Sequence, residues 1–316
     1  MKISELIDKT QQTAFSFELL PPLKGNSIGQ VFKTIDRLKE FDPKFINITT
    51  HHSENIYRED ESGVYRKTNV RKRPGSVAIA AAIQHRYGIR AVPHIISKGF
   101  SKEETEYALI DLAFLGVTDL LLLRGDTKKL DAQQRSMDSH DHATGLQEQV
   151  NNFNRGIAFD GSSFTPPETP FSYGMACYPE KHEESPNMES EILYTKMKAD
   201  NGADYLVTQM FFDNSKYFAF VERCRAAGIT IPIIPGIKPV NLLSQLTVLP
   251  QIFRTEIPEP LEKELRKCKN DEEAKEVGVA WCIAQCRELV AHKVPSIHFY
   301  SLMATESVRR VAQEIY

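Results

Sequence analysis

Apolar runs that are typical of buried strands alternate with amphipathic helical patterns along almost the whole chain of 316 residues. The runs lie near residues 13–18, 44–49, 89–95, 118–124, 171–178, 204–210, 230–235 and 296–301. Strict alternation of this kind indicates parallel strands joined by right-handed crossovers. Eight such units predict an α/β fold of the (β/α)8 TIM-barrel type, built as a single domain over residues 1–316. An open, doubly wound sheet is the structural alternative.

Residues at the predicted junctions support these boundaries. A glycine stands where each of four helices is expected to end, shortly before the next strand, at Gly88, Gly116, Gly202 and Gly228. Glycine readily adopts the left-handed conformation that ends many helices. Helix starts are marked by Ser101 with Glu104, which has capping-box spacing, and by Asn187, which is followed by acidic residues.

Two segments interrupt the alternation. Residues 127–170 are polar and contain a short helical pattern at 143–155, so we expect a long βα excursion over the barrel mouth. Residues 256–293 form a charged helical run, which predicts an elaborated helix between the seventh and eighth strands. We expect neither segment to be a second domain.

Composition narrows the class of protein. The net charge is −3, and no basic stripe of the kind that binds nucleic acid is present. The five cysteines are scattered and odd in number, which argues against a disulfide framework and fits a reducing compartment. The N-terminus lacks the apolar core of a secretion signal, and no run approaches the ~18 apolar residues of a spanning helix. We therefore expect a soluble, cytoplasmic protein without nucleic-acid or membrane partners.

Most predicted strands end in a side chain that can take part in chemistry. These residues are Glu18, Thr49, His94, the Arg124-Gly125-Asp126 triplet, Tyr178 and Gln209. In a (β/α)8 barrel the carboxyl ends of the strands meet at one mouth, where active sites are built. The pattern therefore predicts an enzyme and the position of its site.

Glu18 is the candidate general acid. It ends an apolar strand and is flanked by Phe17 and Leu19, and Pro21-Pro22 would stiffen the loop that follows. Desolvation raises the pKa of a carboxyl group, which suits an acid that works near neutral pH. The alternative is a barrel-end glutamate held in a salt bridge.

The triplet Arg124-Gly125-Asp126 is a candidate ligand-binding turn. Glycine between two charged residues lets the backbone approach a ligand closely. The arginine can hold a phosphate or a polarised carbonyl, and the aspartate can accept a hydrogen bond from a heterocycle N–H. A buried ion pair is the alternative interpretation.

Other candidate groups form no recognised motif. His94, His182 and the remaining histidines lack an H-x3-H pattern or a cysteine at ligand spacing, which favours roles other than metal binding. Cys282 and Cys286 are four residues apart, which predicts one buried helix face. The run 210–212 (Met-Phe-Phe) is compatible with a pocket wall and with ordinary packing. No glycine-rich nucleotide motif is present, so a nucleotide cofactor would be held by the barrel mouth.

The same residues carry a resemblance to a known family. The segments FSFELLPP, INITT, AVPHI, LLLLRGD, YGMACYPEKHEE, NGADYLVTQMFFD and IPIIPGIKPV occur in this order. Together they resemble methylenetetrahydrofolate reductase of the bacterial type, which consists of the catalytic domain only. The resemblance implies an FAD-containing (β/α)8 barrel, usually a homo-oligomer. It also implies ping-pong reduction of 5,10-methylenetetrahydrofolate to 5-methyltetrahydrofolate by NADH or NADPH, which feeds methionine synthesis.

The resemblance also implies roles for individual residues. Glu18 matches the family's general acid, and Asp126 matches an aspartate beside the flavin and the pterin. Gln209 and Gln245 match substrate contacts. Flavin-contact positions correspond to Thr49, His94, Arg124, Gly125, Asp126, His142, Ala143, Thr144, Tyr178, His182 and Lys198.

The chain departs from the family pattern at two positions. Ala304 stands where many members have a substrate-binding arginine, so that contact is expected to be missing or supplied elsewhere, with Lys238 as the candidate. Gly145 stands where an acidic residue is frequent. A protein electron donor in place of a nicotinamide nucleotide stays open. The competing interpretations are another flavin barrel, such as a proline dehydrogenase-like oxidase, and a non-catalytic flavin- or folate-binding partner.

Overall fold

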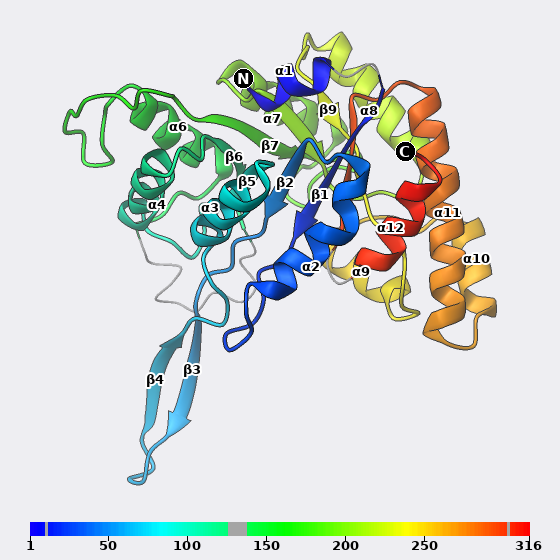
Figure 1. Ribbon diagram of the computed structural model, residues 1–316, viewed down its shortest axis with the longest axis horizontal. Coiled ribbons are helices and arrows are strands. Elements are labelled where there is room, and N and C mark those ends of the chain that lie inside the picture. The colour runs from blue at the N-terminus through cyan, green and yellow to red at the C-terminus, as the bar shows by residue number, and fades with distance from the viewer. Residues whose placement is uncertain (10–11, 126–137, 302–303) are drawn as a thin grey trace. The chain divides into compact units, whose positions relative to one another are not determined.

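A computed structural model describes residues 1–9, 12–125, 138–301 and 304–316 (Figure 1). Its main sheet has the strand order β10-β11-β1-β2-β5-β6-β7-β8-β9. The strands are β1 (Ala14–Leu19), β2 (Phe45–Ile48), β5 (Arg90–Ile96), β6 (Asp119–Leu123), β7 (Ser172–Cys177), β8 (Tyr205–Thr208), β9 (Ile233–Ile234), β10 (Gly236–Ile237) and β11 (Ser296–Tyr300). Each of the eight predicted strands is present, most with bounds shifted by one or two residues.

The two ends of this strand order belong to one interrupted strand. β9 pairs with β8 and β10 pairs with β11, both in parallel, and only Pro235 separates β9 from β10. Proline has no N–H for a strand ladder, while the Pro235 carbonyl accepts a hydrogen bond from the His298 amide at 2.9 Å. Counting β9 and β10 as one strand gives the eight parallel strands of a (β/α)8 barrel, so the predicted fold class is confirmed.

Most of the described helices lie in the connections between the strands, while the first precedes β1 and the last follows β11. They are α1 (Ile3–Asp8), α2 (Gly29–Leu38), α3 (Ser76–Tyr87), α4 (Lys102–Phe114), α6 (Ala143–Asn154), α7 (Met188–Asp200), α8 (Asn214–Ala226), α9 (Gln245–Phe253), α10 (Glu259–Lys267), α11 (Asp271–Ala291) and α12 (Thr305–Gln313), with a 3-10 turn at Lys39–Phe41. The charged run after the seventh strand contains α10 and α11, and the long excursion contains α6, as predicted. Among the described residues, none of these helices is long and apolar enough to cross a membrane.

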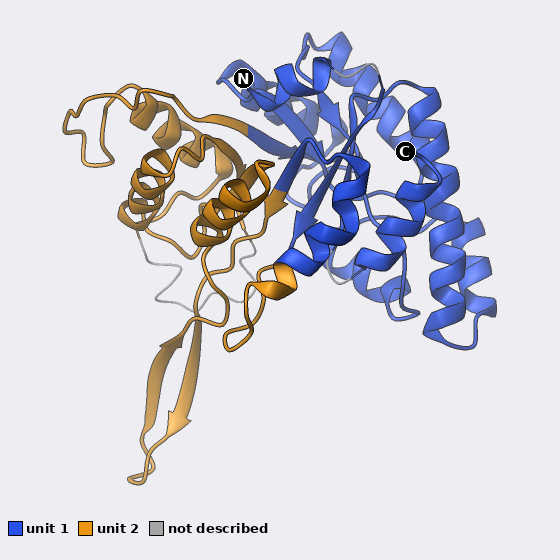
Figure 2. Cartoon of the chain, in the orientation of Figure 1, with its two compact units in different colours: residues 1–19, 32–46, 174–316 blue, residues 20–31, 47–173 orange. Residues whose placement is uncertain are grey.

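By contacts between residues the chain divides into two compact units (Figure 2). Unit 1 comprises residues 1–19, 32–46 and 174–316, and unit 2 comprises residues 20–31 and 47–173. The single-domain organisation expected from the sequence stays a prediction.

In unit 1 the side chains of each strand point alternately to the two faces of the sheet. Phe15 lies 5.5 Å from the ring of Phe299 and 5.4 Å from that of Tyr316, which follows α12, so this face packs toward the C-terminal helix. Ser16 is on the opposite face and lies 3.0 Å from Nδ1 of His298. Since side chains alternate along a strand, Glu18 shares the face of Ser16. That face points to the interior, where the ring of His298 stacks on Phe45.

Unit 2 contains the helix boundaries that the sequence marks most clearly. The Ser101 hydroxyl oxygen accepts a hydrogen bond from the Glu104 amide at 3.0 Å, and the Glu104 carboxylate accepts one from the Ser101 amide at 2.8 Å. This is the predicted capping box at the start of α4. Gly88 ends α3 with φ 65°, in the left-handed region. In unit 1, Asn187 caps α7 in the same way, by accepting from the Ser190 amide at 2.8 Å.

A two-stranded ribbon in unit 2 was not predicted. β3 (Glu54–Glu59) and β4 (Tyr65–Val70) pair in antiparallel register and extend away from the helices of unit 2 (Figure 1). Asp60 closes the turn by accepting from the Ser62 and Val64 amides. The side chains of the ribbon are mostly exposed, so the apolar periodicity that reveals buried strands is absent from its sequence.

Candidate functional site

Glu18 lies at the carboxyl end of β1 and is buried, with 6% of its surface exposed. Burial raises the pKa of its carboxyl group to about 8, although the positive charge of Lys238 acts in the opposite direction. Desolvation therefore outweighs attraction to the lysine, and Glu18 is mostly protonated at neutral pH. This agrees with the carboxylic acid expected from the sequence, while its catalytic role remains a proposal.

Glu18, Tyr300 and Lys238 lie at the carboxyl ends of three neighbouring strands of unit 1. Glu18 is the residue before the last of β1, Tyr300 is the last of β11, and Lys238 directly follows β10. Glu18 is opposite Tyr300 in the β1–β11 register, and Ile237 is opposite Phe299 in the β10–β11 register, which brings Lys238 level with Tyr300. The Tyr300 hydroxyl donates to the Thr208 carbonyl at 2.6 Å. Lys238 is 6% exposed, and burial lowers the pKa of its ammonium group. The end of this part of the sheet thus combines a proton donor with a buried cation.

The loop after β7 carries two of the predicted flavin contacts. The rings of Tyr178 and His182 meet edge to face, with centroids 4.7 Å apart. Glu191, which is buried in the first turns of α7, accepts from the His182 amide at 3.0 Å and from the Ser185 hydroxyl at 2.7 Å. The buried side chain of Glu191 therefore holds the backbone at His182, whose ring meets that of Tyr178.

Lys198 reaches the same rings from α7. Its Nζ donates to the Ala176 carbonyl at 2.8 Å and lies 5.6 Å from the centroid of the Tyr178 ring. Burial lowers the pKa of this ammonium group, whereas the carboxylate of Glu191 raises it. An ammonium group has three N–H donors and a positive charge, which are the properties that suit contact with an anion.

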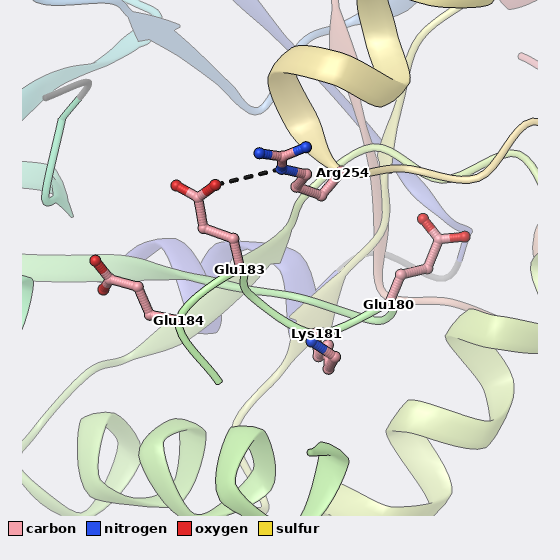
Figure 3. A pocket seen from close by; sticks show the side chains of 5 residues that line it. All are labelled: Glu180, Lys181, Glu183, Glu184 and Arg254. Atoms are coloured by element: carbon pink, nitrogen blue, oxygen red, sulfur yellow. Dashed lines mark hydrogen bonds and ion pairs between the residues drawn. The ribbon is translucent and has the colours of Figure 1, made fainter. Parts of the chain in front are cut away.

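A cavity of about 660 Å³ lies beside this loop (Figure 3). It is lined by Glu180, Lys181, Glu183, Glu184 and Arg254. Arg254 donates to the Glu183 carboxylate at 3.3 Å, and these two side chains point toward each other in Figure 3. Glu180 accepts from the Thr255 hydroxyl and the Glu256 amide. These contacts tie the β7–α7 loop to the end of α9.

The two predicted substrate glutamines lie in unit 1. Gln209 follows β8, where its amide donates to the Cys177 carbonyl at 2.8 Å. Gln245 is the first residue of α9, and its side-chain oxygen accepts from the Asn241 amide at 2.8 Å. Next to Gln209, Met210 and Phe212 belong to a hydrophobic cluster that includes Leu261. The run 210–212 is therefore explained by packing.

In unit 2, Thr49 follows β2 directly, whereas His94 lies inside β5, which continues to Ile96 and does not end at His94 as predicted. His94 is 4% exposed, and burial lowers its pKa to about 3, with a further decrease from His51. Its imidazole is therefore neutral at physiological pH. The Thr49 hydroxyl lies 3.1 Å from Nε2 of His51, and the Thr50 hydroxyl donates to the His94 carbonyl at 2.5 Å.

Arg124 and Gly125 follow β6 in unit 2, and Asp126 lies outside the described residues. The Arg124 carbonyl accepts from the Lys98 amide at 2.8 Å, which extends the β5–β6 pairing by one step. Gly125 has φ 89°, and a Cβ there would lie 3.2 Å from the Ile96 side chain. Both observations explain why glycine occupies this turn.

The predicted contacts His142, Ala143 and Thr144 form the start of α6. His142 is the N-cap residue, and its side chain makes no capping hydrogen bond. The first amides of a helix lack partners within it and carry the positive end of the helix dipole. This helix start can therefore accept an anionic group.

Sequence reasoning did not single out Glu191 or Tyr300, and it considered Lys238 only as a substitute for an absent arginine. A signal for Lys238 was available, because a lysine inside the apolar run IPIIPGIKPV is unusual. Charged side chains are rarely fully buried unless they are paired. Among the described residues, no group of three or more histidine, cysteine or acidic side chains could hold a metal ion.

Comparisons with known proteins identify the family that the chain resembles. The family model described as methylenetetrahydrofolate reductase matches residues 2–316. A probable methylenetetrahydrofolate reductase (NADPH) of Caenorhabditis elegans is 30% identical over 321 residues, which are 99% of this chain and 44% of that protein. Methylenetetrahydrofolate reductase (NADH) 1 of Arabidopsis thaliana is 29% identical over 308 residues, or 94% of this chain and 47% of that protein. The chain thus spans about half the length of these relatives.

A bacterial relative is matched over most of its length. The 5,10-methylenetetrahydrofolate reductase of Escherichia coli is 27% identical over 296 residues, which are 93% of this chain and 88% of that protein. Among solved structures, an uncharacterized protein from Clostridium thermocellum that binds 5-methyl-5,6,7,8-tetrahydrofolic acid has a TM-score of 0.57 at 14% identity, covering 99% of this chain and 98% of that chain. A tryptophan synthase chain from M. tuberculosis has a TM-score of 0.51 at 11% identity, with the same coverage. At such identities the likeness concerns the fold alone.

Proposed function

Because the chain belongs to the methylenetetrahydrofolate reductase family, we propose that it reduces 5,10-methylenetetrahydrofolate to 5-methyltetrahydrofolate with electrons from NADH or NADPH. The observation that carries the proposal is Glu18, a buried carboxyl group with a pKa of about 8 at a strand end. Reduction of this substrate requires a proton donor at neutral pH, and a protonated glutamate supplies one. We further propose that the enzyme is a homo-oligomer of the cytoplasm. Its product would be used in methionine synthesis.

We propose FAD as the resident cofactor. In unit 2, the start of α6 at His142 to Thr144 has no side-chain cap from His142 and suits a phosphate group. In unit 1, the ammonium group of Lys198 suits an anionic group as well. The paired rings of Tyr178 and His182 suit an aromatic ring system. When bound, FAD would supply a two-electron carrier that serves the nicotinamide nucleotide and the folate in turn, which is the basis of ping-pong kinetics. Thr49, His94, Arg124, Gly125 and Asp126 complete the proposed set.

Glu18 would give its proton to a nitrogen of the folate's five-membered ring. The C–N bond then opens, its electron pair stays on the nitrogen, and the remaining cation is ready to accept hydride. Asp126 is proposed to stabilise this cation and to tune the cofactor. Gln209 and Gln245 are proposed to orient the substrate. Their amide groups can both donate and accept hydrogen bonds.

The test is an anaerobic visible spectrum of the purified protein, recorded after addition of NADH and then of methylenetetrahydrofolate. Wild type should be yellow, lose its colour with NADH and regain it with the folate. Glu18→Gln should still lose its colour with NADH, but folate turnover should fall by about 100-fold or more, as expected for loss of a general acid. Glu222→Gln, at an exposed position of α8, is the matched control.

The outcomes separate the parts of the proposal. A protein that remains colourless after reconstitution with FAD would exclude the flavoenzyme. A yellow protein that is reduced by neither NADH nor NADPH would indicate a protein electron donor. Normal folate turnover in Glu18→Gln would remove Glu18 as the acid.

A further inference from the structure

Lys238 is a buried charge that the roles proposed above do not use. It follows β10 directly and is 6% exposed, as is Glu18. A lysine ammonium group is strongly hydrated, so removing it from water is costly unless a partner compensates. The position of Lys238 therefore calls for an explanation in terms of its neighbours.

Strand register brings Lys238 to Glu18. Glu18 and Tyr300 are opposite each other on β1 and β11, and Lys238 is the residue after Ile237, which is opposite Phe299. The three residues therefore form one row across three adjacent strands. A Cβ at Gly236 would lie 2.5 Å from the Tyr300 ring, so Gly236 faces the side of the sheet that carries Tyr300. Side chains alternate along strands, so residues two apart share a face. Lys238 shares the face of Gly236, and thus the interior face that carries Tyr300 and Glu18.

Ionisable groups from several elements act on this row. Lys238 interacts electrostatically with Glu18 from β1 and with Cys282 from α11. Tyr300 from β11 interacts with Glu18, and also with Cys177 and Tyr178 from the end of β7 and the loop after it. Its hydroxyl donates to the Thr208 carbonyl. The positive charge of Lys238 lowers the pKa of Glu18, against the effect of burial.

We propose that Lys238 is a positioning residue of the reaction, whose ammonium group stabilises the carboxylate that Glu18 becomes when it donates its proton. The inference rests on the proposed function. In the step, the O–H bond of Glu18 breaks and both its electrons stay on the carboxylate, while the proton forms an N–H bond with the folate ring nitrogen. Lys238 keeps its own protons throughout. Without the cation, the step would leave an uncompensated negative charge in a buried site.

A direct role in binding the substrate's exposed anionic tail fits this position less well. Lys238 is almost fully buried and lies level with the acid. Its compact ammonium group acts as a point charge on one neighbour, in contrast to the planar fork with which an arginine binds two oxygens. The lysine would therefore serve the acid and would not reproduce the contact of the arginine absent at Ala304.

The test is an infrared pH titration of Glu18 in the whole protein. The carboxylic-acid band of Glu18 is identified as the band that Glu18→Gln lacks. In Lys238→Met, a substitution of similar length, the midpoint of this band should rise by about 1 unit or more, since an opposite charge at close range shifts a carboxyl pKa by about that amount. Lys238→Arg should keep the midpoint near that of wild type. Lys263→Met, on the exposed side of α10, is the matched control.

Kinetics supply the second measurement. In Lys238→Met the rate of the folate half-reaction should fall by about tenfold or more at neutral pH, with little change in KM, and its alkaline limb should move to higher pH. An unchanged midpoint for Glu18 in Lys238→Met would overturn the inference, as would a rise in KM alone. Absence of folate turnover in wild type would instead refute the proposed function, because the infrared titration does not depend on the folate.

Discussion

Replacing Glu18 with glutamine should change how the stability of the protein depends on pH. In the folded chain the pKa of Glu18 is raised from 4.5 to about 8. The folded state therefore holds a proton that the unfolded state releases between these two pH values. By linkage, wild-type stability is at its full value below pH 4.5 and falls as pH rises toward 8, because burying the charged carboxylate is unfavourable. Glutamine does not titrate, so the free energy of unfolding of the variant should not fall in this way as the pH rises.

The magnitude follows from the size of the shift. Each unit of pKa difference corresponds to about 1.4 kcal/mol, so the full span amounts to about 5 kcal/mol. Between pH 6 and pH 9 the free energy of unfolding of wild type should fall by about 3 kcal/mol relative to that of Glu18→Gln. The attraction of Lys238 is already contained in the pKa of about 8.

The assay is urea unfolding at several pH values, followed by the fluorescence of the single tryptophan, Trp281. Trp281 reports on the same unit as Glu18, since its indole donates to the Phe212 carbonyl at 3.0 Å. Glu222→Gln measures the effect of the same substitution at an exposed position. A difference between wild type and Glu18→Gln that stays constant from pH 6 to pH 9 would refute the reasoning.

Three further outcomes follow from local geometry. Gly236→Ala should lower stability by about 1–3 kcal/mol in the same assay, because its Cβ would lie 2.3 Å from the Thr208 carbonyl oxygen; wild-type stability would show that the backbone yields easily. Ser101→Ala should cost about 1 kcal/mol by removing the cap of α4, and an unchanged unfolding curve would argue against the capping box. His94, with a pKa of about 3, should remain neutral from pH 5 to pH 9 in NMR spectra of its ring nitrogens, and a titration near pH 6.5 would contradict its burial.

The parts of the fold that the sequence predicts well are those fixed by local chemistry. Gly88 ends α3 in the left-handed conformation, and Ser101 with Glu104 starts α4, as their residue types indicate. The eight strands were found because they are buried on both faces, which leaves long apolar runs. The seventh was predicted at 230–235, but its paired residues lie on both sides of Pro235. In the sequence, Pro235 is compatible with the end of the strand. That Gly236 and Ile237 continue the pairing, with β11, is seen only in the structure.

The site was predicted only in part, for a physical reason. The identity of Glu18 and its strand-end position could be read from the sequence, and so could its desolvation by Phe17 and Leu19. The neighbour that lowers this pKa could not be read from the sequence, because Lys238 lies 220 residues later in the chain. Only the register of β1 and β10 with β11 shows that Lys238 and Glu18 are level. Glu191 was hidden similarly, since a glutamate in a helix gives no sign that its side chain binds the loop before that helix.

The ribbon formed by β3 and β4 begins and ends at one point, because Glu54 is opposite Val70 in its register. Pairs of residues can therefore be added to or removed from its two strands without changing the separation of the flanking segments. Loop closure depends only weakly on the length of such a segment. The Lys24 amide donates to the Lys72 carbonyl at the base of the ribbon, which ties its root to the loop after β1. The ribbon is thus a place where the chain can vary in length during evolution, or accept a reporter group, while the strands that carry His94 and Arg124 keep their register.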